Sequence, residues 1–464
     1  MESKEKPVSE QTTTPPAMER RRFLQTMGSA VGLAAAATLA GPDDVLRTVE
    51  AAAQSLSGLS PKQAAREESF WLGIQQAFTM SRSLINLDNA WTCPSPRLVT
   101  EAVVRYTWLQ EEEPAQQWIQ KLRPRQESVR IGLARLFGCD PEEIALVRNA
   151  TEALQIVLFG IPLKSGDEVL TTSLDYGSMV STLNYRQQRD GIVLKRIDMP
   201  TPPKAMEELA GAFERAITPK TRLILVSHIA YLNGQVFPIK NICDLAHQRG
   251  IEVVVDGAHS FAHLDFTRQD LDCDYFGTSL HKWLLAPKGT GLLYVRKDKI
   301  ETIPPLMSAP SGRRKANIRK FEQVGTHPAA PILAIAEALS FHTVIGSKRK
   351  EERLRYLKDY WAERLRKVPN VRLYTSLQPE MSCGIATVGV EGVHPVAFRD
   401  YLWERHRVQT ARIVSAGIQG LRVSPNLYTT LNELDYFCEV VEDVAKKGLP
   451  EPHKSFKPDD TTTG

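Results

Sequence analysis

Short runs of apolar residues alternate with amphipathic stretches along most of the chain. Several of these runs are apolar throughout, which is typical of parallel strands that are buried on both faces. The predicted strands cover residues 167–173, 191–198, 221–229, 251–259, 273–280 and 289–295. Helical spacing is found before and between them, at residues 67–73, 127–138 and 239–250. This alternation predicts an α/β domain with a mostly parallel central sheet.

The pattern changes after about residue 330. Residues 348–369 form a long, highly charged helical stretch, which we expect to belong to a smaller C-terminal α+β domain and to carry its charges on a solvated face. The predicted organisation is a signal peptide and linker at 1–55, a helical and extended segment at 56–99, a large domain at 100–330, a small domain at 331–450 and a flexible tail at 451–464.

The N-terminus has the layout of an export signal. Arg20, Arg21 and Arg22 precede Phe23 and a mild apolar run at residues 27–40, as in twin-arginine signals. The alternative is a membrane anchor, but the run is shorter and richer in alanine than a bilayer span of about 20 apolar residues. We expect twin-arginine export to the periplasm or another extracytoplasmic site, with no membrane attachment after the signal is removed.

Composition narrows the classes of partner. The chain has 464 residues, of which 42% are hydrophobic and 24% are charged, and its formal net charge is +4. It lacks a basic stripe with interleaved aromatics, so we expect no nucleic-acid partner. The six cysteines are scattered without a CxxC pair, so we expect no metal site and free, mostly buried thiols.

Chemically versatile side chains follow the predicted strands. In a parallel sheet, ligands gather at the carboxyl ends of the strands. These positions supply a lysine, a carboxylate, imidazoles, a hydroxyl and an aromatic ring, with a capping pair at a nearby helix start: Lys282, Asp256, His259, His281, Ser279, Tyr176, Asn149 and Glu152. Pyridoxal phosphate requires such a set, because it needs a lysine for its Schiff base, an acid against its ring nitrogen and a cradle for its phosphate.

Seven motifs extend over most of the chain after the signal: NATEAL (149–154), LDYGSM (174–179), SHIAYLNGQVFPI (227–239), VVVDGAHSFAHLD (253–265), DYFGTSLHKWLLAPKGTGLLYV (274–295), FEQVGTHPAAP (321–331) and LRVSPNLYTT (421–430). Together they resemble the class V aminotransferase superfamily of fold-type I pyridoxal-phosphate enzymes, in the branch that holds isopenicillin N epimerase-like proteins and cysteine desulfurases. The resemblance implies pyridoxal 5'-phosphate as cofactor and a homodimer with shared sites.

The resemblance also implies cofactor roles by position. Lys282 is expected to form the Schiff base and to shuttle the proton, Asp256 to hold the ring nitrogen protonated, and His259 to contact the phenolic oxygen of the ring. Tyr176 is expected to stack on the ring. The phosphate is expected to lie against Ala150, Thr151, Ser279 and His281. The structural alternatives are a loop lysine, a strand-end cap, a structural histidine, a core tyrosine and plain helix capping.

Other matched positions are expected to contact the substrate or the partner subunit. Arg422 matches the arginine that clamps the substrate carboxylate, and Asn89 lies where the N-terminal segment of the family lines the substrate pocket. Gly325 and Thr326 match the segment that reaches across the homodimer to the phosphate of the other site. The alternatives are a surface ion pair for Arg422 and a simple turn for Gly325 and Thr326.

The chain departs from the family pattern at two places. Tyr231 stands where desulfurases and many relatives have an asparagine. The sequence from Val408 to Arg422 lacks the nucleophilic cysteine that desulfurases need, and we interpret Cys383 as structural.

The expected activity is chemistry at the α-carbon of an amino acid or small amine. An epimerase-like enzyme or an aminotransferase comes first, and a C–S lyase or desulfurase comes second. A non-catalytic binding protein of the same fold is the remaining alternative. Epimerisation would draw its acid from Tyr231 or Tyr176, whereas transamination of a dicarboxylic acceptor would need a second cation, for which Arg412 is the nearest candidate.

Overall fold

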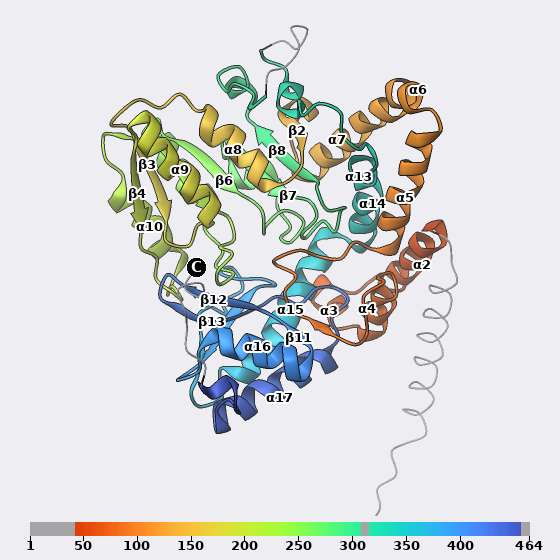
Figure 1. Cartoon of the computed structure of the whole chain (residues 1–464), viewed down its shortest axis with the longest axis vertical. Helices are drawn as coiled ribbons and strands as arrows, with labels where there is room; N and C mark the ends of the chain where they lie inside the picture. The colour runs from red at the N-terminus through yellow and green to blue at the C-terminus, as the bar shows by residue number, and fades with distance from the viewer. Residues whose placement is uncertain (1–41, 308–314, 456–464) are drawn as a thin grey trace, which may run out of the picture.

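A seven-stranded sheet forms the centre of the larger of two domains (Figure 1). The computed structural model describes residues 42–307 and 315–455, so the predicted twin-arginine signal lies outside the described residues. The strand order is β2-β8-β7-β6-β5-β3-β4, and all strands run parallel except β8, which is antiparallel to β2 and β7. The strands are β2 (Ile144–Val147), β3 (Glu168–Thr172), β4 (Val193–Ile197), β5 (Thr221–Ser227), β6 (Glu252–Asp256), β7 (Tyr275–Ser279) and β8 (Gly291–Val295).

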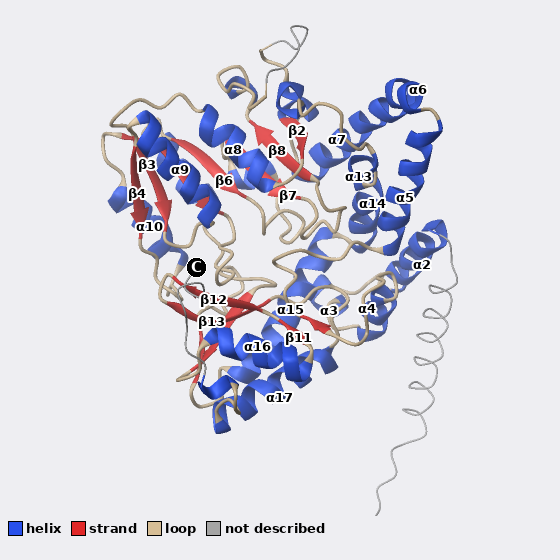
Figure 2. Cartoon of the chain, viewed as in Figure 1, coloured by secondary structure: helices blue, strands red, loops and turns tan. Residues whose placement is uncertain are grey.

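Helices cover both faces of this sheet (Figure 2). Strand side chains alternate between the faces, so consecutive apolar residues of one strand enter two separate cores. One core includes side chains of α8 (Ala150–Gly160) and α9 (Gly177–Asp190), and the other includes those of α7 (Arg123–Phe137), α10 (Met206–Ala216) and α11 (Ile239–His247). This double burial explains the apolar strands, and the predicted mostly parallel sheet is confirmed.

The smaller domain contains a four-stranded antiparallel sheet in the order β12-β13-β10-β9. Its strands are β9 (Val371–Leu373), β10 (Ala386–Val390), β12 (Ala411–Ser415) and β13 (Ile418–Val423). Its core is shared with helices α15 (Ser347–Leu365), α16 (Pro395–His406) and α17 (Leu431–Lys447). The arrangement confirms the expected small α+β domain at the C-terminal end of the chain.

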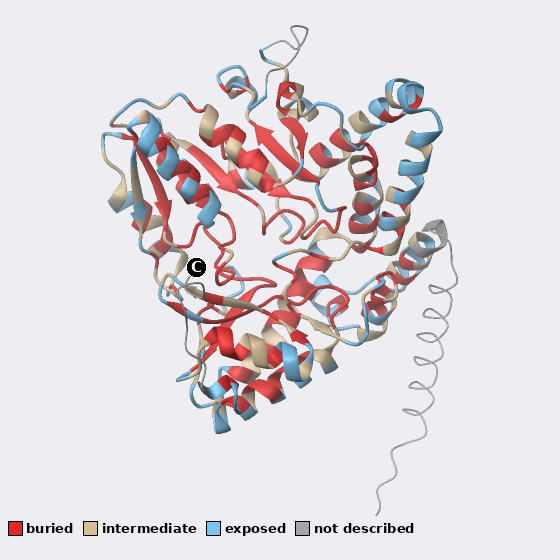
Figure 3. Ribbon diagram, in the orientation of Figure 1, coloured by how far each residue is buried: buried red, intermediate tan, exposed pale blue. Residues whose placement is uncertain are grey.

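The N-terminal segment contacts both domains. β1 pairs in parallel with β11 (Val408–Gln409) of the small domain, and α5 packs against α13 (Ala330–Leu333) beside the large one. Figure 3 shows the central strands as buried and much of α5 and α6 as exposed. The segment comprises α2 (Pro42–Ser55), α3 (Pro61–Ala64), α4 (Glu68–Gln75), β1 (Ile85–Asn86), α5 (Arg97–Glu112), α6 (Pro114–Gln117) and the π-helical turn η1 (Trp118–Leu122).

Two boundaries differ from the sequence-based organisation. Residues 42–55 form α2 where a linker was expected, because Val49 and Ala52 lie one turn apart and are buried. Helix α14 (Ile335–Ile345) packs against α2, α5 and α7, so the small domain begins at α15 and not at residue 331. The remaining short elements are α12 (Arg268–Leu271), η2 (Pro141–Glu143), η3 (Lys297–Lys299), η4 (Ile318–Glu322) and η5 (His453–Ser455).

The expectation that α15 carries its charges on a solvated face is wrong. Lys350, Arg353 and Lys358 are at most 1% exposed. Arg353 donates to Glu68 Oε1 at 2.5 Å, and Lys350 Nζ donates to the carbonyl oxygen of Trp283. The helix packs against α3, α14, α17 and β10, so several of its faces are covered and its charges need partners inside the protein.

The cysteines are all unpaired. Cys139 is half-buried and the other five are buried, as the sequence predicts. Residues 42–307 and 315–455 contain no cluster of three or more His, Cys, Asp or Glu side chains that could hold a metal ion. In the same residues, no single helix is long and apolar enough to cross a membrane, although residues 330–345 and 347–365 together, bent by 78°, meet that length and composition.

Candidate active site

A cavity of about 400 Å³ lies between the large and the small domain. The large domain contributes the ends of β5, β6 and β7 and the first turn of α8, and the small domain contributes β12 and β13. Most of the predicted site residues line this cavity: Ala150, Thr151, Tyr176, Asp256, His259, Ser279, His281, Lys282 and Arg422. Tyr231 and Arg412 line it as well, whereas Asn89, Gly325 and Thr326 are not among its lining residues.

Lys282 lies in the turn that follows β7. Its Nζ is 3.3 Å from His259 Nε2. Burial of the amine lowers the pKa of Lys282 to about 8, although the carboxylate of Asp256 opposes this effect by favouring the charged form. About half of the amine is therefore neutral at pH 8, far more than for a lysine at its ordinary pKa of 10.5, and a nucleophilic lysine has to be neutral to react.

Asp256 ends β6 and is 5% exposed. Burial raises the pKa of its carboxyl group to about 6, while a hydrogen bond from the Ala258 amide at 2.9 Å and the charge of Lys282 favour the carboxylate. Within residues 42–307 and 315–455 the carboxylate has no ion-pair partner, although it lines the cavity. A cation placed against it, such as a protonated ring nitrogen, would stabilise its charged form.

Trp283 fixes the hydrogen position on His259. The Trp283 indole Nε1–H, which can only donate, lies 3.4 Å from His259 Nδ1, so Nδ1 is the acceptor. Burial holds the pKa of His259 well below its ordinary value, so the ring is neutral and carries its hydrogen on Nε2. That N–H faces Lys282 Nζ, whose lone pair can accept it when the amine is neutral. Trp283, the residue after Lys282, thus orients the ring of His259.

Trp283 is itself held rigidly. It is fully buried and stacks on His263 with ring centroids 3.8 Å apart. His263 Nδ1 lies 2.7 Å from the carbonyl oxygen of His259, and its Nε2 accepts from the Gly384 amide at 2.8 Å, so both ring nitrogens are used. Sequence analysis missed Trp283 because its role depends on a contact with His259 that only the fold creates.

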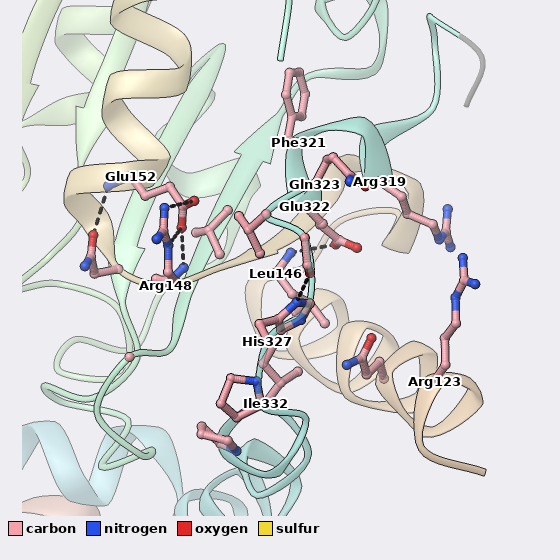
Figure 4. A pocket seen from close by; sticks show the side chains of 18 of the residues that line it. Arg123, Leu146, Arg148, Glu152, Arg319, Phe321, Glu322, Gln323, His327 and Ile332 are labelled. Atoms are coloured by element: carbon pink, nitrogen blue, oxygen red, sulfur yellow. Dashed lines mark hydrogen bonds and ion pairs between the residues drawn. The ribbon is translucent and has the colours of Figure 1, made fainter. Parts of the chain in front are cut away.

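The first turn of α8 forms one end of the cavity. Asn149 Oδ1 caps the helix by accepting from the Glu152 amide at 2.9 Å, and the Ala150 amide donates to Ser279 Oγ at 2.9 Å. Half of the predicted capping box is absent, because the Glu152 carboxylate pairs with Arg148 instead, as Figure 4 shows. The helix start and Ser279 therefore form one continuous polar wall.

His281 adds an unsatisfied polar atom to this cavity. Its Nδ1 is buried and has no hydrogen-bond partner among the described residues. Burial lowers the pKa of His281 to about 4, so the ring is neutral at neutral pH. Thr151 also lines the cavity, and its hydroxyl can donate a hydrogen bond to an anion there.

The two tyrosines of the cavity contact each other. The rings of Tyr176 and Tyr231 lie edge to face, with centroids 5.3 Å apart. Tyr176 is 42% exposed at the start of α9, whereas Tyr231 is half-buried and its carbonyl oxygen accepts from Arg422 at 2.9 Å. The tyrosine that replaces the family's asparagine therefore faces the cavity and also helps to position Arg422.

Asp175 is a buried carboxylate that sequence analysis did not single out. Its Oδ1 accepts from the amide and hydroxyl of Ser227 at 2.7 Å, and its Oδ2 accepts from Thr171 and Thr172. These bonds tie the ends of β3 and β5 together. They also fix the backbone just before Tyr176.

Arg422 faces the cavity as predicted, but it already has a carboxylate partner. It is 4% exposed on β13, and one terminal nitrogen donates to Asp88 Oδ1 at 2.9 Å. The other terminal nitrogen donates to Tyr231 O, while Nε is buried without a partner in the described chain. Sequence analysis missed Asp88 because the pairing depends on how the N-terminal segment docks on β13.

Asn89 does not line the cavity. Its side chain is fully buried, donates to the Ser424 carbonyl at 2.8 Å and accepts from the Tyr428 hydroxyl at 2.6 Å. The side-chain amide of Asn89 thus has hydrogen-bond partners for both its nitrogen and its oxygen, at the place where the segment after β1 meets the end of β13. Ala90 and Trp91, the next two residues, line the cavity instead.

Gly325 and Thr326 are exposed and lie apart from the Lys282 cavity. Gly325 lines a separate cavity of about 650 Å³ next to the start of α8, together with Arg148 and Glu152 (Figure 4). Its φ of +75° is one that glycine adopts readily. Their predicted role is at the site of a partner subunit, and it stays a prediction.

The cavity residues fit pyridoxal phosphate. Lys282 provides an amine with a lowered pKa, Asp256 provides a carboxylate without an ion-pair partner among the described residues for the ring nitrogen, and Tyr176 provides a partly exposed ring. The phosphate would meet the first turn of α8 with Ser279, Thr151 and the unsatisfied His281 nitrogen. Every chemical part of the cofactor thus has a matching side chain in one cavity.

The lowered pKa of Lys282 predicts how cofactor loading depends on pH. An amine adds to an aldehyde only when it is neutral, so the loading rate of the apoprotein should rise toward pH 8 and level off above it. With a lysine at its ordinary pKa of 10.5, the loading rate would continue to rise well above pH 8. Stopped-flow absorbance measures this profile, and a rise that continues past about pH 10 would contradict the assignment.

A matched variant tests the cause of the shift. The Asp256 carboxylate favours the charged amine, so Asp256→Asn should move the plateau of the loading rate to a lower pH. An unchanged plateau in this variant would show that Asp256 does not act on Lys282.

Comparison with known proteins identifies the family. Isopenicillin N epimerase of Streptomyces clavuligerus is 30% identical over 388 residues, covering 80% of this chain and 98% of that protein. The "Probable cysteine desulfurase" of Synechocystis sp. is 29% identical over 390 residues, covering 77% of this chain and 90% of that protein. A solved cysteine desulfurase from Thermococcus onnurineus NA1 shares the fold, with a TM-score of 0.72 at 23% identity over 81% of this chain and 98% of that chain. Residues 85–437 match the aminotransferase class V family, and the chain therefore belongs to this family of pyridoxal-phosphate enzymes.

Proposed function

We propose that this enzyme removes and returns the α-proton of an amino acid, with epimerase-like chemistry. The observation that carries the proposal is a lysine with a lowered pKa that shares one cavity with two tyrosines, Tyr176 and Tyr231. An amine base and a hydroxyl acid are the groups that proton exchange at carbon needs. The similarity to an isopenicillin N epimerase over most of both chains supports this choice.

The residues of the cavity have different roles in the proposed reaction. The cofactor, when bound, supplies an electron sink for the charge that develops at the α-carbon. Lys282 Nζ takes the α-proton on its lone pair, and the ring of His259, whose Nε2 lies 3.3 Å away, limits where the amine can lie. Asp256 holds the positive charge of the ring nitrogen by its own negative charge. Arg422 binds the substrate carboxylate through the hydrogens that Asp88 and Tyr231 leave unused.

The acid that returns the proton is the feature that favours epimerisation over transamination. Burial raises the pKa of Tyr231, so its hydroxyl keeps its proton at neutral pH and can donate it. Tyr176 lies against Tyr231 and is more exposed, so it can exchange protons with solvent. An aminotransferase needs no such second group, because its proton is delivered by the lysine alone.

Desulfurase chemistry has less support, although relatives with that name are similar to this chain. It requires a reactive thiolate near the substrate. Burial raises the pKa of Cys383 to about 12, and its Sγ lies 3.6 Å from the Glu351 carbonyl oxygen, outside the cavity lining. None of the residues that line the Lys282 cavity is a cysteine.

An isotope experiment tests the proposed reaction. Incubation of the holoenzyme with amino acids in heavy water should exchange the α-proton while the visible absorption band of the bound cofactor persists. Proton NMR measures the exchange, and chiral chromatography measures the appearance of the other enantiomer. Conversion of the cofactor to its amine form with release of a keto acid would identify an aminotransferase, and the absence of any exchange would favour a binding protein.

Variants assign the two proton-transfer groups. Lys282→Ala should lower exchange by about 10²–10⁴-fold, the usual contribution of a general acid or base. One of the two tyrosines is expected to return the proton to the α-carbon. The variant that removes it, Tyr231→Phe or Tyr176→Phe, should slow formation of the other enantiomer more than it slows α-proton exchange. Trp91→Phe, at the cavity wall but without an acid–base group, serves as the control. If Tyr231→Phe, Tyr176→Phe and Trp91→Phe all lowered α-proton exchange and enantiomer formation equally, the acid role of the tyrosines would be contradicted.

We also propose that the enzyme is a homodimer in which Gly325 and Thr326 contact the cofactor phosphate of the partner subunit. Both residues are exposed and cannot serve the cavity of their own chain in this structure. A mixture of Thr326→Ala and Lys282→Ala subunits should recover cofactor retention, because a hybrid dimer contains one site with both native residues. If each site were formed by one chain alone, every site in the mixture would keep one of the two substitutions, and cofactor retention would not recover.

We propose further that the protein is exported by the twin-arginine pathway, on the basis of Arg20, Arg21 and Arg22 before the alanine-rich run. Replacing all three with lysine should retain the protein in the cytosol in cell fractionation, since this pathway recognises the arginine pair. Replacement of Lys4 and Lys6 with arginine is the matched control. Normal export of the triple-lysine variant would refute the proposal.

A further inference from the structure

A stacked pair of rings, Trp283 and His263, holds His259 by its side chain and by its backbone. The Trp283 indole nitrogen lies 3.4 Å from His259 Nδ1, and His263 Nδ1 lies 2.7 Å from the backbone carbonyl oxygen of His259. The centroids of the two stacked rings are 3.8 Å apart. The pair therefore fixes the residue whose Nε2 lies 3.3 Å from Lys282 Nζ.

The small domain contacts each ring of this pair. Lys350, in the first turns of α15, donates from Nζ to the backbone carbonyl oxygen of Trp283. The amide of Gly384, just before β10, donates to His263 Nε2 at 2.8 Å. A Cβ atom on Gly384 would lie 2.8 Å from that same nitrogen, so a side chain there would displace the ring. The small domain thus helps to place both rings.

Lys350 is buried without a counter-charge. It is 1% exposed, and in the part of the chain that the structure describes its amine forms no ion pair and one hydrogen bond, the one to Trp283. Burial lowers the pKa of Lys350 to about 7, and both the charged and the neutral amine keep a hydrogen to donate. The titratable groups on which its charge acts are Cys93, His263 and His342, and burial keeps all three uncharged at neutral pH. The contact with Trp283 therefore offsets part of the cost of burying this amine.

The turn that carries Lys282 includes a strained backbone. Leu285 is 1% exposed and has a φ of +64°, which a bulky residue rarely adopts. Its amide donates to the carbonyl oxygen of Lys282 at 3.1 Å. Such a conformation persists only where surrounding contacts hold it. The carbonyl oxygen of Trp283, inside this turn, has Lys350 as its one hydrogen-bond partner among the described residues, so this bond is one of those contacts.

We propose that Lys350 is a positioning residue for the amine of Lys282, because it holds Trp283 where the indole can donate to His259. Lys350 does not line the cavity and acts only through Trp283. The small domain thereby helps to determine which ring nitrogen of His259 carries the hydrogen that faces Lys282. The inference is independent of the reaction at the α-carbon, since it concerns the amine before any substrate binds.

Nitrogen NMR of the full-length, cofactor-free protein with ¹⁵N-labelled histidines measures the tautomer of His259 directly. Its signals are identified as those that disappear in His259→Asn. In the native protein, Nε2 should carry the hydrogen and Nδ1 should be bare. Lys350→Met keeps the length of the side chain and removes the donor, so it should convert His259 to a mixture of the two tautomers. Trp283→Phe, which removes the indole N–H, should do the same.

The pH dependence of cofactor loading gives a second measurement. Besides burial, the charges that act on Lys282 are those of Asp256, Arg422, Cys93 and Asp88. When the hydrogen leaves Nε2 of His259, the neutral amine loses a donor and the charged amine gains an acceptor, so the pKa of Lys282 should rise. The plateau of the loading rate in Lys350→Met should therefore move up by about one pH unit, the size expected for one hydrogen bond. This shift is opposite in sign to that expected for Asp256→Asn.

A double-mutant cycle separates positioning from a direct effect of charge. If Lys350 acts through Trp283, adding Lys350→Met to Trp283→Phe should move the plateau little further. A direct effect of the Lys350 charge on Lys282 would persist in the Trp283→Phe background. Lys358→Met is the matched control, because Lys358 is fully buried on the same helix but donates to Ser382 Oγ at 3.0 Å and to Asp359. It should leave the tautomer and the plateau unchanged, even if it lowers the melting temperature.

Three results would overturn the inference: a native His259 with its hydrogen on Nδ1, a native tautomer and plateau in Lys350→Met, or shifts that add fully to those of Trp283→Phe. Methionine has no charge to bury, so we expect Lys350→Met to fold, and near-ultraviolet circular dichroism checks this. Lys350→Leu is the second replacement, and the same outcomes decide with it. The NMR measurement needs neither cofactor nor substrate, so it stands even if the proposed reaction fails.

Discussion

The burial of one amine governs the arrangement of the active site. Enclosure lowers the pKa of Lys282 to about 8, because the effect of burial outweighs the attraction of Asp256. A neutral amine then needs a donor rather than a carboxylate as its direct neighbour, and His259 supplies one only in the tautomer that Trp283 imposes. The sequence His-Lys-Trp thus places Lys282 directly before Trp283, the residue that orients His259 beside the amine.

The same loop is anchored from the small domain. Lys350 of α15 donates to the backbone of Trp283, and Arg353, one turn later, is held by Glu68 of the N-terminal segment. The buried charges of α15 therefore connect three parts of the molecule. Charges in such a position contribute more to the relative placement of the parts than to net stability, because their desolvation offsets much of their attraction.

The sequence was sufficient for the parts of this structure that depend on local pattern. Apolar runs mark strands buried on both faces, and strand ends converge, so Asp256 and Lys282 could be assigned to one site. It was insufficient where a side chain finds its partner far along the chain. Asn89 is bonded to Ser424, 335 positions away, and nothing in the segment after β1 indicates that docking. The burial of α15 was missed for the same reason, since it is covered by elements from both ends of the chain.

The ion pair between Asp88 and Arg422 has a consequence for the order in which the protein assembles. Its members are 334 positions apart, and the paired strands β1 and β11 are separated almost as widely. During synthesis, the ends of β5, β6 and β7 can come together while the last strands of the small domain are still unmade. The end of the cavity that contains Asp256 and Lys282 is therefore formed early, whereas the end that contains Arg422 exists only when nearly the whole chain has left the ribosome.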